Sequence, residues 1–318
     1  MQANQNRKMT LVIIGIAMLM LVASSSSDPV CPPGYPTHGT PVSGLDVDFI
    51  QFALNLEFLE AELFMWSAFG YGLDHAAPEL VNGGPPPIAP QKANLDPLTR
   101  NITGEFGLQE IGHVRSIIRT VGGFPRPLLN LSAANFATIM NEAFGYELEP
   151  PFNPYRDPLS YMLGAYTVPY VGLLGYVGAN PFLTGYYSKR LVAGLLGVEA
   201  GQDAVIREYL YERAGEVVWP YNHTVAEFTW RISELRNRLA KCGVKDEGII
   251  VPECMGAENQ TDTNLLSADP NSLSYSRTPP EILRIVYGTG DEHLPGGFFP
   301  RGGRGKIATH FLQPKPWI

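Results

Sequence analysis

Glu110-Ile111-Gly112-His113 is the stretch that decides the fold. It lies in a segment whose apolar residues recur at helical spacing, and a glutamate and a histidine three residues apart point from the same side of a helix. Such a Glu-x-x-His step supplies two ligands of a carboxylate-bridged two-metal site in a four-helix bundle. The rest of the sequence decides whether a bundle surrounds it and whether other helices supply the remaining ligands.

The chain is expected to be all-α, because no series of alternating strand patterns appears in it. An aspartate followed by proline is a strong helix start, and it occurs at Asp96-Pro97 and Asp157-Pro158. Pro169 lies inside an apolar helical pattern and predicts a kink or break there. The expected helices are about Leu45–Phe69, Pro97 to Gly122, Ser132–Phe144, Leu159–Ala179, Thr184–Ala214 and, after the capping box Thr224 to Glu227, a further helix ending near Cys242.

The first helix carries acids on the side where a soluble helix is apolar. Glu57 and Glu60 fall among its apolar positions, whereas Asn55 and Glu62 fall on the polar side with Asp48 and Gln51. Lone ionised carboxylates in an apolar bundle are costly. Glu57, with Glu60 as a substitute, is therefore a candidate ligand.

The candidate metal ligands are Glu57, Glu110, His113 and Glu199, and this set is incomplete. Gln202 stands three residues after Glu199, where a second histidine is expected, and the third helix has no acid between Leu159 and Ala179. Fewer anionic ligands weaken the binding of a second cation most. Three states stay open: a two-metal centre, a single weakly bound metal, and a degenerate metal-free site, which is the state expected here. If a metal binds, iron or manganese is expected.

A metal-free site needs other partners for its buried acids, which must be protonated, paired or hydrogen-bonded. Tyr166 and Tyr170, one turn apart on the third helix, are the expected donors. His113 would pair with Glu57 or Glu110. A polar network of this kind would fix the helix register without any catalysis.

The N-terminus indicates secretion. Arg7-Lys8, an apolar stretch from Met9 to Val22 and small residues up to Ser27 have the pattern of a signal peptide. We expect a signal peptide at 1–27, an extended segment at 28–44, a helical domain at 45–243 and an irregular C-terminal segment packed on that domain at 244–318. Glycosylation sequons begin at Asn101, Asn130, Asn222 and Asn259, and Cys242 with Cys254 is the candidate disulfide, which leaves Cys31 over.

The charge of the chain excludes one class of partner. Its net charge is −8, and nucleic acid binding needs clustered lysine and arginine. After removal of the signal peptide, no further membrane span is expected. Partners at the cell surface or in the cell wall are compatible with a secreted chain, and the oligomeric state stays open.

The sequence resembles the plant desiccation-related proteins that carry a ferritin-like domain. The resemblance covers most of the chain after the signal peptide and implies a ferritin-like four-helix bundle with an extra helix, in a secreted, stress-associated plant protein. It also implies Glu57, Glu110, His113 and Glu199 as ligand positions, with Gln202 and Pro169-Tyr170 as departures. The matching stretches are Asp48–Glu62, Glu110–His113, Tyr176–Pro181, Val198–Ala200, Pro280–Tyr287 and Gly296–Pro300.

Three functions follow from these observations. The expected one is a secreted, glycosylated, desiccation-associated protein without enzymatic activity, located in the apoplast or cell wall. The alternative is a metal-dependent oxidase that uses iron or manganese at the four candidate ligands. Iron sequestration is a third possibility, against which the long loops and the C-terminal segment argue.

Overall fold

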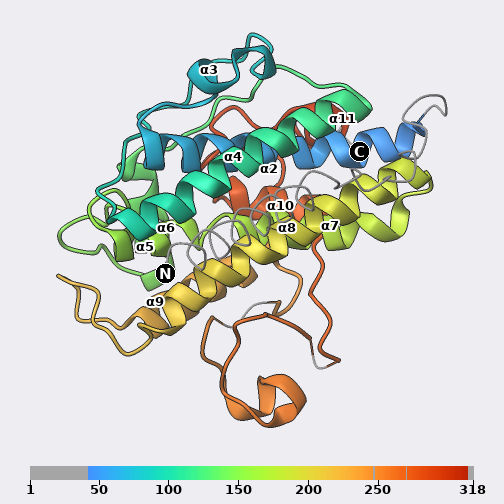
Figure 1. Cartoon of the computed structure of the whole chain (residues 1–318). Helices are drawn as coiled ribbons and strands as arrows, with labels where there is room; N and C mark the ends of the chain where they lie inside the picture. Colours follow the sequence, from blue (N-terminus) through green and yellow to red (C-terminus); the bar gives the residue numbers. More distant parts are fainter. Residues whose placement is uncertain (1–41, 246–247, 270, 314–318) are drawn as a thin grey trace, which may run out of the picture. The chain divides into compact units, whose positions relative to one another are not determined.

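A four-helix bundle forms the centre of the molecule, as the sequence predicts. The computed structural model describes residues 42–313 except 246–247 and 270. Helix α2 packs along α4, and α7 packs along α8, while α2 also contacts α7 and α8 (Figure 1). The described residues contain helices and isolated bridges but no strand. The bundle helices are α2 (Gly44–Phe69), α4 (Pro97–Val121), α6 (Pro158–Ala165) with α7 (Pro169–Ala179), and α8 (Tyr186–Tyr211).

The predicted helix starts are confirmed by their caps. The Asp96 side chain accepts hydrogen bonds from the backbone N–H groups of Leu98 and Thr99, and Asp157 accepts one from Ser160. The break predicted at Pro169 is also confirmed, because α6 ends at Ala165 and α7 begins at Pro169. The third helix of the bundle therefore consists of two shorter helices joined by a turn.

Two more helices lie against the bundle. Helix α5 (Ala133–Phe144) contacts α9 (Val225–Ala240), and α9 contacts α6 and α8. Short helices α3 (Leu73–Ala76) and a 3-10 turn at Pro78–Leu80 belong to the connection between α2 and α4. The stretch 158–182 is long and apolar enough to cross a membrane, but most of it is buried among the other helices, where it forms part of the core.

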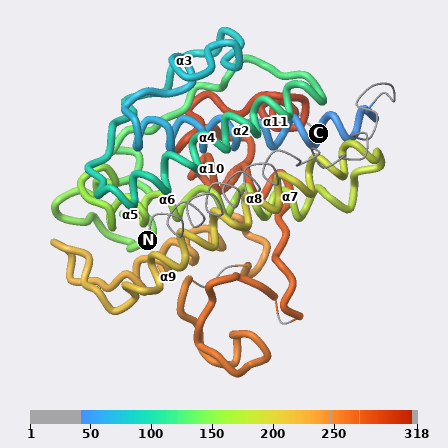
Figure 2. Tube along the Cα trace, in the orientation of Figure 1, coloured from blue at the N-terminus to red at the C-terminus, as the bar shows by residue number. Residues whose placement is uncertain are grey.

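The C-terminal segment contributes to the same core. Helix α10 (Pro279–Val286) contacts α9 and α7, and α11 (Gly305–Phe311) contacts α2, so that segments far apart in sequence lie side by side (Figure 2). Asn55 donates a hydrogen bond to the carbonyl of Arg304 and accepts one from its N–H. The tail thus covers a side of α2 that the sequence predicts to be exposed.

Glu62 is also buried, contrary to the polar face predicted for α2. It pairs with the buried Arg126, whose guanidinium also bonds Asp74 and the carbonyl of Pro85. These bonds connect α2 to the α2–α4 connection and to the segment after α4. The prediction was wrong because the amphipathic pattern of one helix does not reveal a buried cation from elsewhere.

The remaining predictions have mixed outcomes. The signal peptide, Cys31 and most of the segment 28–44 lie outside the described residues, and the helix begins at Gly44. The disulfide is not formed in this structure, since Cys242 and Cys254 are separate exposed thiols. Of the sequon asparagines, Asn101, Asn222 and Asn259 are exposed and Asn130 is half-buried.

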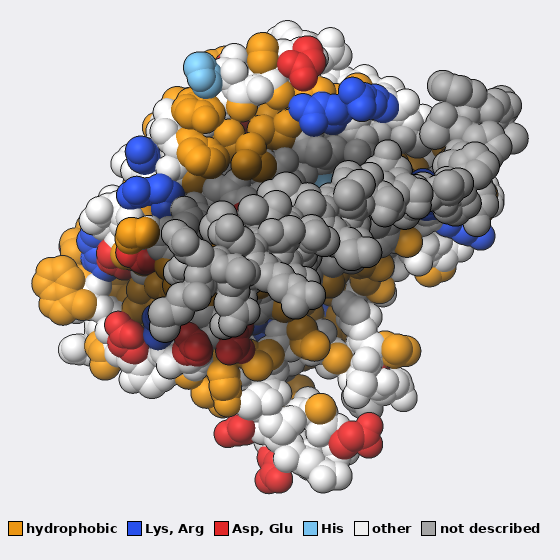
Figure 3. Space-filling view, in the orientation of Figure 1, with side chains coloured by type: hydrophobic (Ala, Val, Ile, Leu, Met, Phe, Trp, Pro, Cys, Tyr) orange, Lys and Arg blue, Asp and Glu red, His pale blue; other side chains and the backbone are white. Residues whose placement is uncertain are grey.

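One projecting loop is distinctly acidic. Residues 248–269 include Glu253, Glu258, Asp262 and Asp269 but no lysine or arginine. Figure 3 shows acidic and polar side chains on this lobe, at the bottom of the view, with no basic side chain among them. A surface of this charge is unsuited to phosphate contacts.

Candidate metal centre

The four predicted ligands lie together in the centre of the bundle. Glu57 comes from α2, Glu110 and His113 from α4, and Glu199 from α8. Each offers one ligand atom, and these atoms all lie within 4.8 Å of one another. All four side chains are buried. We call these four residues the carboxylate–histidine cluster.

His113 is the hub of the cluster. Its Nδ1 lies 3.1 Å from Glu57 Oε2, 3.2 Å from Glu110 Oε2 and 3.5 Å from Glu199 Oε1. Carboxylates from three helices thus converge on one ring nitrogen. That arrangement is the one expected of donors that share a metal ion or, without metal, a proton.

Two further side chains hold the carboxylates in place. Tyr176 of α7 donates its hydroxyl hydrogen to Glu57, and the Gln202 amide nitrogen donates to Glu110 Oε1 at 2.6 Å. Gln202 therefore occupies the expected place of the second histidine as a hydrogen-bond donor.

The tyrosine donors predicted from the sequence were wrong. Tyr166 bonds Ser233, and the Tyr170 hydroxyl donates to the Lys245 carbonyl and to Ser267. Tyr170 and Tyr176 lie six residues apart on α7 and point to different sides of it, and only the packing of α7 in the bundle shows that Tyr176 faces the cluster.

Burial and mutual repulsion shift the protonation of the cluster. Desolvation, with the charges of neighbouring carboxylates, raises the pKa of Glu110 and of Glu60 well above the usual value. Desolvation also raises the pKa of Glu199 to about 7, despite the opposing effect of the nearby His113.

Glu57 and His113 shift in the directions of an ion pair. Burial alone would raise the pKa of Glu57, but His113 and the other donors bring it below the usual value. Burial would lower the pKa of His113, but its hydrogen bonds to the three carboxylates raise it. Without metal, these shifts favour an ion pair between Glu57 and His113 and disfavour ionisation of the neighbouring carboxyl groups.

The donor set fits a divalent metal ion. Glu60 Oε2, Glu199 Oε2 and Gln202 Oε1 are buried and have no hydrogen-bond partner within the described part of the chain. Buried oxygens without partners are costly, and a cation would satisfy them. Several carboxylates with one imidazole suit iron or manganese, so Glu57, Glu110, His113 and Glu199 would hold such an ion.

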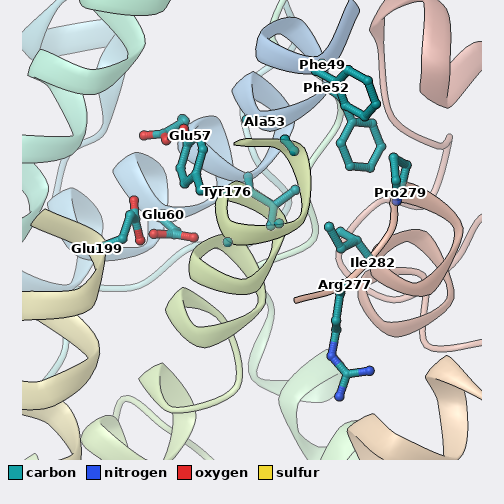
Figure 4. Close-up of a pocket in the computed structure, with 14 residues that line it drawn as sticks. Phe49, Phe52, Ala53, Glu57, Glu60, Tyr176, Glu199, Arg277, Pro279 and Ile282 are labelled. Carbon is teal, nitrogen blue, oxygen red and sulfur yellow. Dashed lines mark hydrogen bonds between the residues drawn. The ribbon is translucent and has the colours of Figure 1, made fainter. Parts of the chain in front are cut away.

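A pocket adjoins this region. It lies between α2, α7 and α10 and is lined at one end by Glu57, Glu60 and Glu199, with Tyr176 beside them (Figure 4). Its other walls are mostly apolar, including Phe49 and Phe52 of α2 and Pro279 and Ile282 of α10. The C-terminal segment therefore forms part of the pocket.

The pocket is small inside. It has room for about one molecule of the size of water.

Sequence reasoning missed Tyr176, Gly172 and the tail residues of the pocket. Tyr176 lies in one of the stretches that carry the family resemblance, but the sequence does not indicate which side of the helix faces the cluster. Gly172 has no side chain, so its residue type does not indicate that it faces a site. Ile282 lies more than 80 positions from the nearest cluster residue in the sequence.

Comparisons with known proteins agree with this architecture. A family model described as a ferritin-like domain matches residues 45–212. A protein of Nesocodon mauritianus named ferritin-like catalase Nec2 is 65% identical over 300 residues, covering 93% of this chain and 96% of that protein. The desiccation-related protein PCC13-62 of Craterostigma plantagineum is 56% identical over 261 residues, covering 82% of this chain and 83% of that protein. No solved structure matches the chain.

The bundle, its cluster and the matching domain define a ferritin-like protein. The two relatives place it more narrowly: the chain belongs to the plant desiccation-related family of ferritin-like proteins, and it is in that sense stress-associated.

Proposed function

We propose that the protein is a metal-dependent enzyme that disproportionates hydrogen peroxide at the carboxylate–histidine cluster. The observation that carries the proposal is a convergence of four buried ligand atoms within 4.8 Å, beside a small pocket, in a chain 65% identical to a protein named a catalase. Together they favour redox catalysis over the non-enzymatic role expected from the sequence. They also favour peroxide over the oxygen chemistry of an oxidase.

The reaction balances between two substrate molecules. One peroxide loses two electrons and two protons and leaves as dioxygen, while the other gains them and leaves as two waters. A bound iron or manganese ion would supply the reversible electron exchange between the two half-reactions.

The side chains of this protein supply metal binding and substrate access. Burial and neighbouring charge raise the pKa values of Glu60 and Glu110 in the metal-free protein, so both carboxyl groups would release protons as metal binds. Tyr176 orients the Glu57 carboxylate through its hydroxyl. The apolar pocket walls admit a molecule of peroxide size and exclude larger reductants and bulk water.

A second candidate function is structural. The hydrogen bonds of His113, Tyr176 and Gln202 already satisfy much of the cluster without metal. Such a network would fix the register of the bundle in a non-catalytic protein.

Oxygen evolution separates these candidates. The purified chain, loaded with Mn²⁺ or Fe²⁺ and freed of excess metal, is mixed with hydrogen peroxide in an oxygen electrode. We expect one O₂ per two peroxides, and loss of activity in Glu110→Gln and in His113→Gln with the helical circular dichroism retained. Glu208→Gln, an exposed change on α8, is the control and should keep full activity. Loaded wild type without oxygen evolution, or equal rates in all variants, would refute the catalase proposal.

We also propose that the protein acts outside the cell. The sequence pattern of residues 1–27 and the exposure of Asn101, Asn222 and Asn259 support this location. Expression in plant cells should yield extracellular protein whose mass falls on treatment with an N-glycosidase. Retention inside the cell at the mass of the unmodified full chain would contradict it.

A further inference from the structure

Gly172 of α7 is a position of the third helix that adjoins the candidate ligands, whereas the resemblance implied Pro169-Tyr170. A Cβ atom built on Gly172 of α7 would lie 2.9 Å from Glu60 Oε1 and 3.7 Å from Glu199 Oε2. Position 172 therefore faces the site, and the missing side chain leaves space there. Glu60 of α2 fills that space.

Glu60 is a second buried acid of α2 beside the candidate ligands. It is 1% exposed and comes one turn after Glu57 on α2, so both carboxylates leave the helix on the same side. Its Oε2 has no hydrogen-bond partner in the described chain, and the same is true of Glu199 Oε2. Both residues line the inner end of the pocket, where Figure 4 shows their carboxylates close together.

We propose that Glu60 replaces the carboxylate of the third helix and completes a second metal position, so that the site binds two divalent ions. Glu57, His113 and Glu110 would hold the first ion. Glu60 and Glu199 would hold the second, with Glu110 shared and the unpartnered Gln202 oxygen as a neutral donor.

Charge balance favours two ions over one. Glu57, Glu60, Glu110 and Glu199 carry four negative charges when all are ionised, and two divalent cations neutralise them. A single ion would leave two negative charges, or two protons, in a buried site. The sequence alone suggested too few carboxylates for a second ion because it counted one acid per helix.

The inference rests on the proposed metal dependence, but counting ions is independent of peroxide turnover. The full-length purified protein is stripped with a chelator, reloaded with Mn²⁺, desalted and analysed for metal per chain. We expect two ions in wild type and in Glu208→Gln, and one ion in Glu60→Gln. In electron paramagnetic resonance, wild type should show a spin-coupled pair, whereas Glu60→Gln should show the six-line signal of an isolated Mn²⁺.

A second variant tests the same space without removing the acid. Gly172→Ala pushes a methyl group against Glu60 Oε1, and we expect at least tenfold weaker binding of the second ion with the first unaffected. A purely structural Glu60 would change the melting temperature of the metal-free protein but not the ion count. Two ions in both variants, or no more than one ion in wild type, would overturn the inference.

The two proposals fail separately. A wild type with one ion and full oxygen evolution would refute the role of Glu60 and leave the catalase function intact. Two ions without oxygen evolution would support the role of Glu60 and refute the catalase function.

Discussion

Replacing Tyr176 with phenylalanine tests the hydrogen-bond network that holds the cluster. Tyr176 is 3% exposed, and its hydroxyl donates to Glu57. The change removes one hydroxyl and keeps the ring, so it leaves almost no cavity. The lost interaction is a buried hydrogen bond to a carboxylate whose pKa is held below its usual value, mainly by His113, and which is therefore ionised.

The expected size of the effect follows from that charge. A hydrogen bond to a charged group contributes about 1.5–3 kcal/mol to stability, against about 1 kcal/mol for a neutral pair. Loss of a group that orients a metal ligand lowers metal affinity about 10–100-fold. We therefore expect Tyr176→Phe to lower the free energy of unfolding of the metal-free protein by about 1.5–3 kcal/mol and to weaken Mn²⁺ binding by that factor.

Tyr155→Phe is the matched control. The same atom is removed from a tyrosine that is 5% exposed and whose hydroxyl donates to the neutral backbone carbonyl of Leu131. Urea denaturation of both metal-free variants at pH 7 gives the stability difference, and calorimetric titration with Mn²⁺ gives the affinity. Equal destabilisation of the two variants, with unchanged Mn²⁺ affinity in Tyr176→Phe, would refute the reasoning.

Three further predictions concern the pocket, the tail and the pH dependence. A Cβ at Gly175 would lie 2.8 Å from Ile282 Cδ1, so Gly175→Leu should slow and Ile282→Ala should speed the removal of bound metal by a chelator; equal rates would show that access lies elsewhere. Truncation after Gly243 removes α10 and α11 with their contacts to α7, α9 and α2, so the melting temperature should fall, and an unchanged melt would refute that packing. Burial and neighbouring carboxylates raise the pKa of Glu60 in the folded protein. With Glu60 protonated, below its unfolded pKa of about 4.5, the folded protein carries no penalty from this residue. The free energy of unfolding then falls as pH rises from there through the folded pKa. Denaturation of metal-free protein between pH 5 and pH 8 should show Glu60→Gln gaining on wild type by at most about 1.4 kcal/mol per pH unit, and a constant difference would contradict this.

The sequence predicted the helices well because their boundaries depend on local chemistry. Asp96 and Asp157 cap the helices that follow them, and Pro169 breaks the third one. These effects involve residues at most a few positions apart. The inward direction of Glu110 and His113 could be predicted for the same reason, since both lie on one face of one helix.

The remainder of the site depends on contacts between distant segments. Tyr176 could not be chosen over Tyr166 and Tyr170, because the side of α7 that faces the cluster depends on how α7 packs against α2 and α8. The role of Glu60 depends on the absence of a side chain at Gly172 in another helix. Neither fact has a local signature in the sequence.

The buried acids of helix α2 differ in the groups that balance their charge. Glu62 has a permanent partner in Arg126, which makes that end of the helix a structural contact. Glu57 shares His113 with two other carboxylates, and Glu60 has an oxygen without any partner in the described chain. A stability function alone would favour a fixed cation at each acid, as at Glu62. Acids compensated only by shared protons are poised to exchange those protons for metal ions, so metal loading should release protons and should tighten as pH rises.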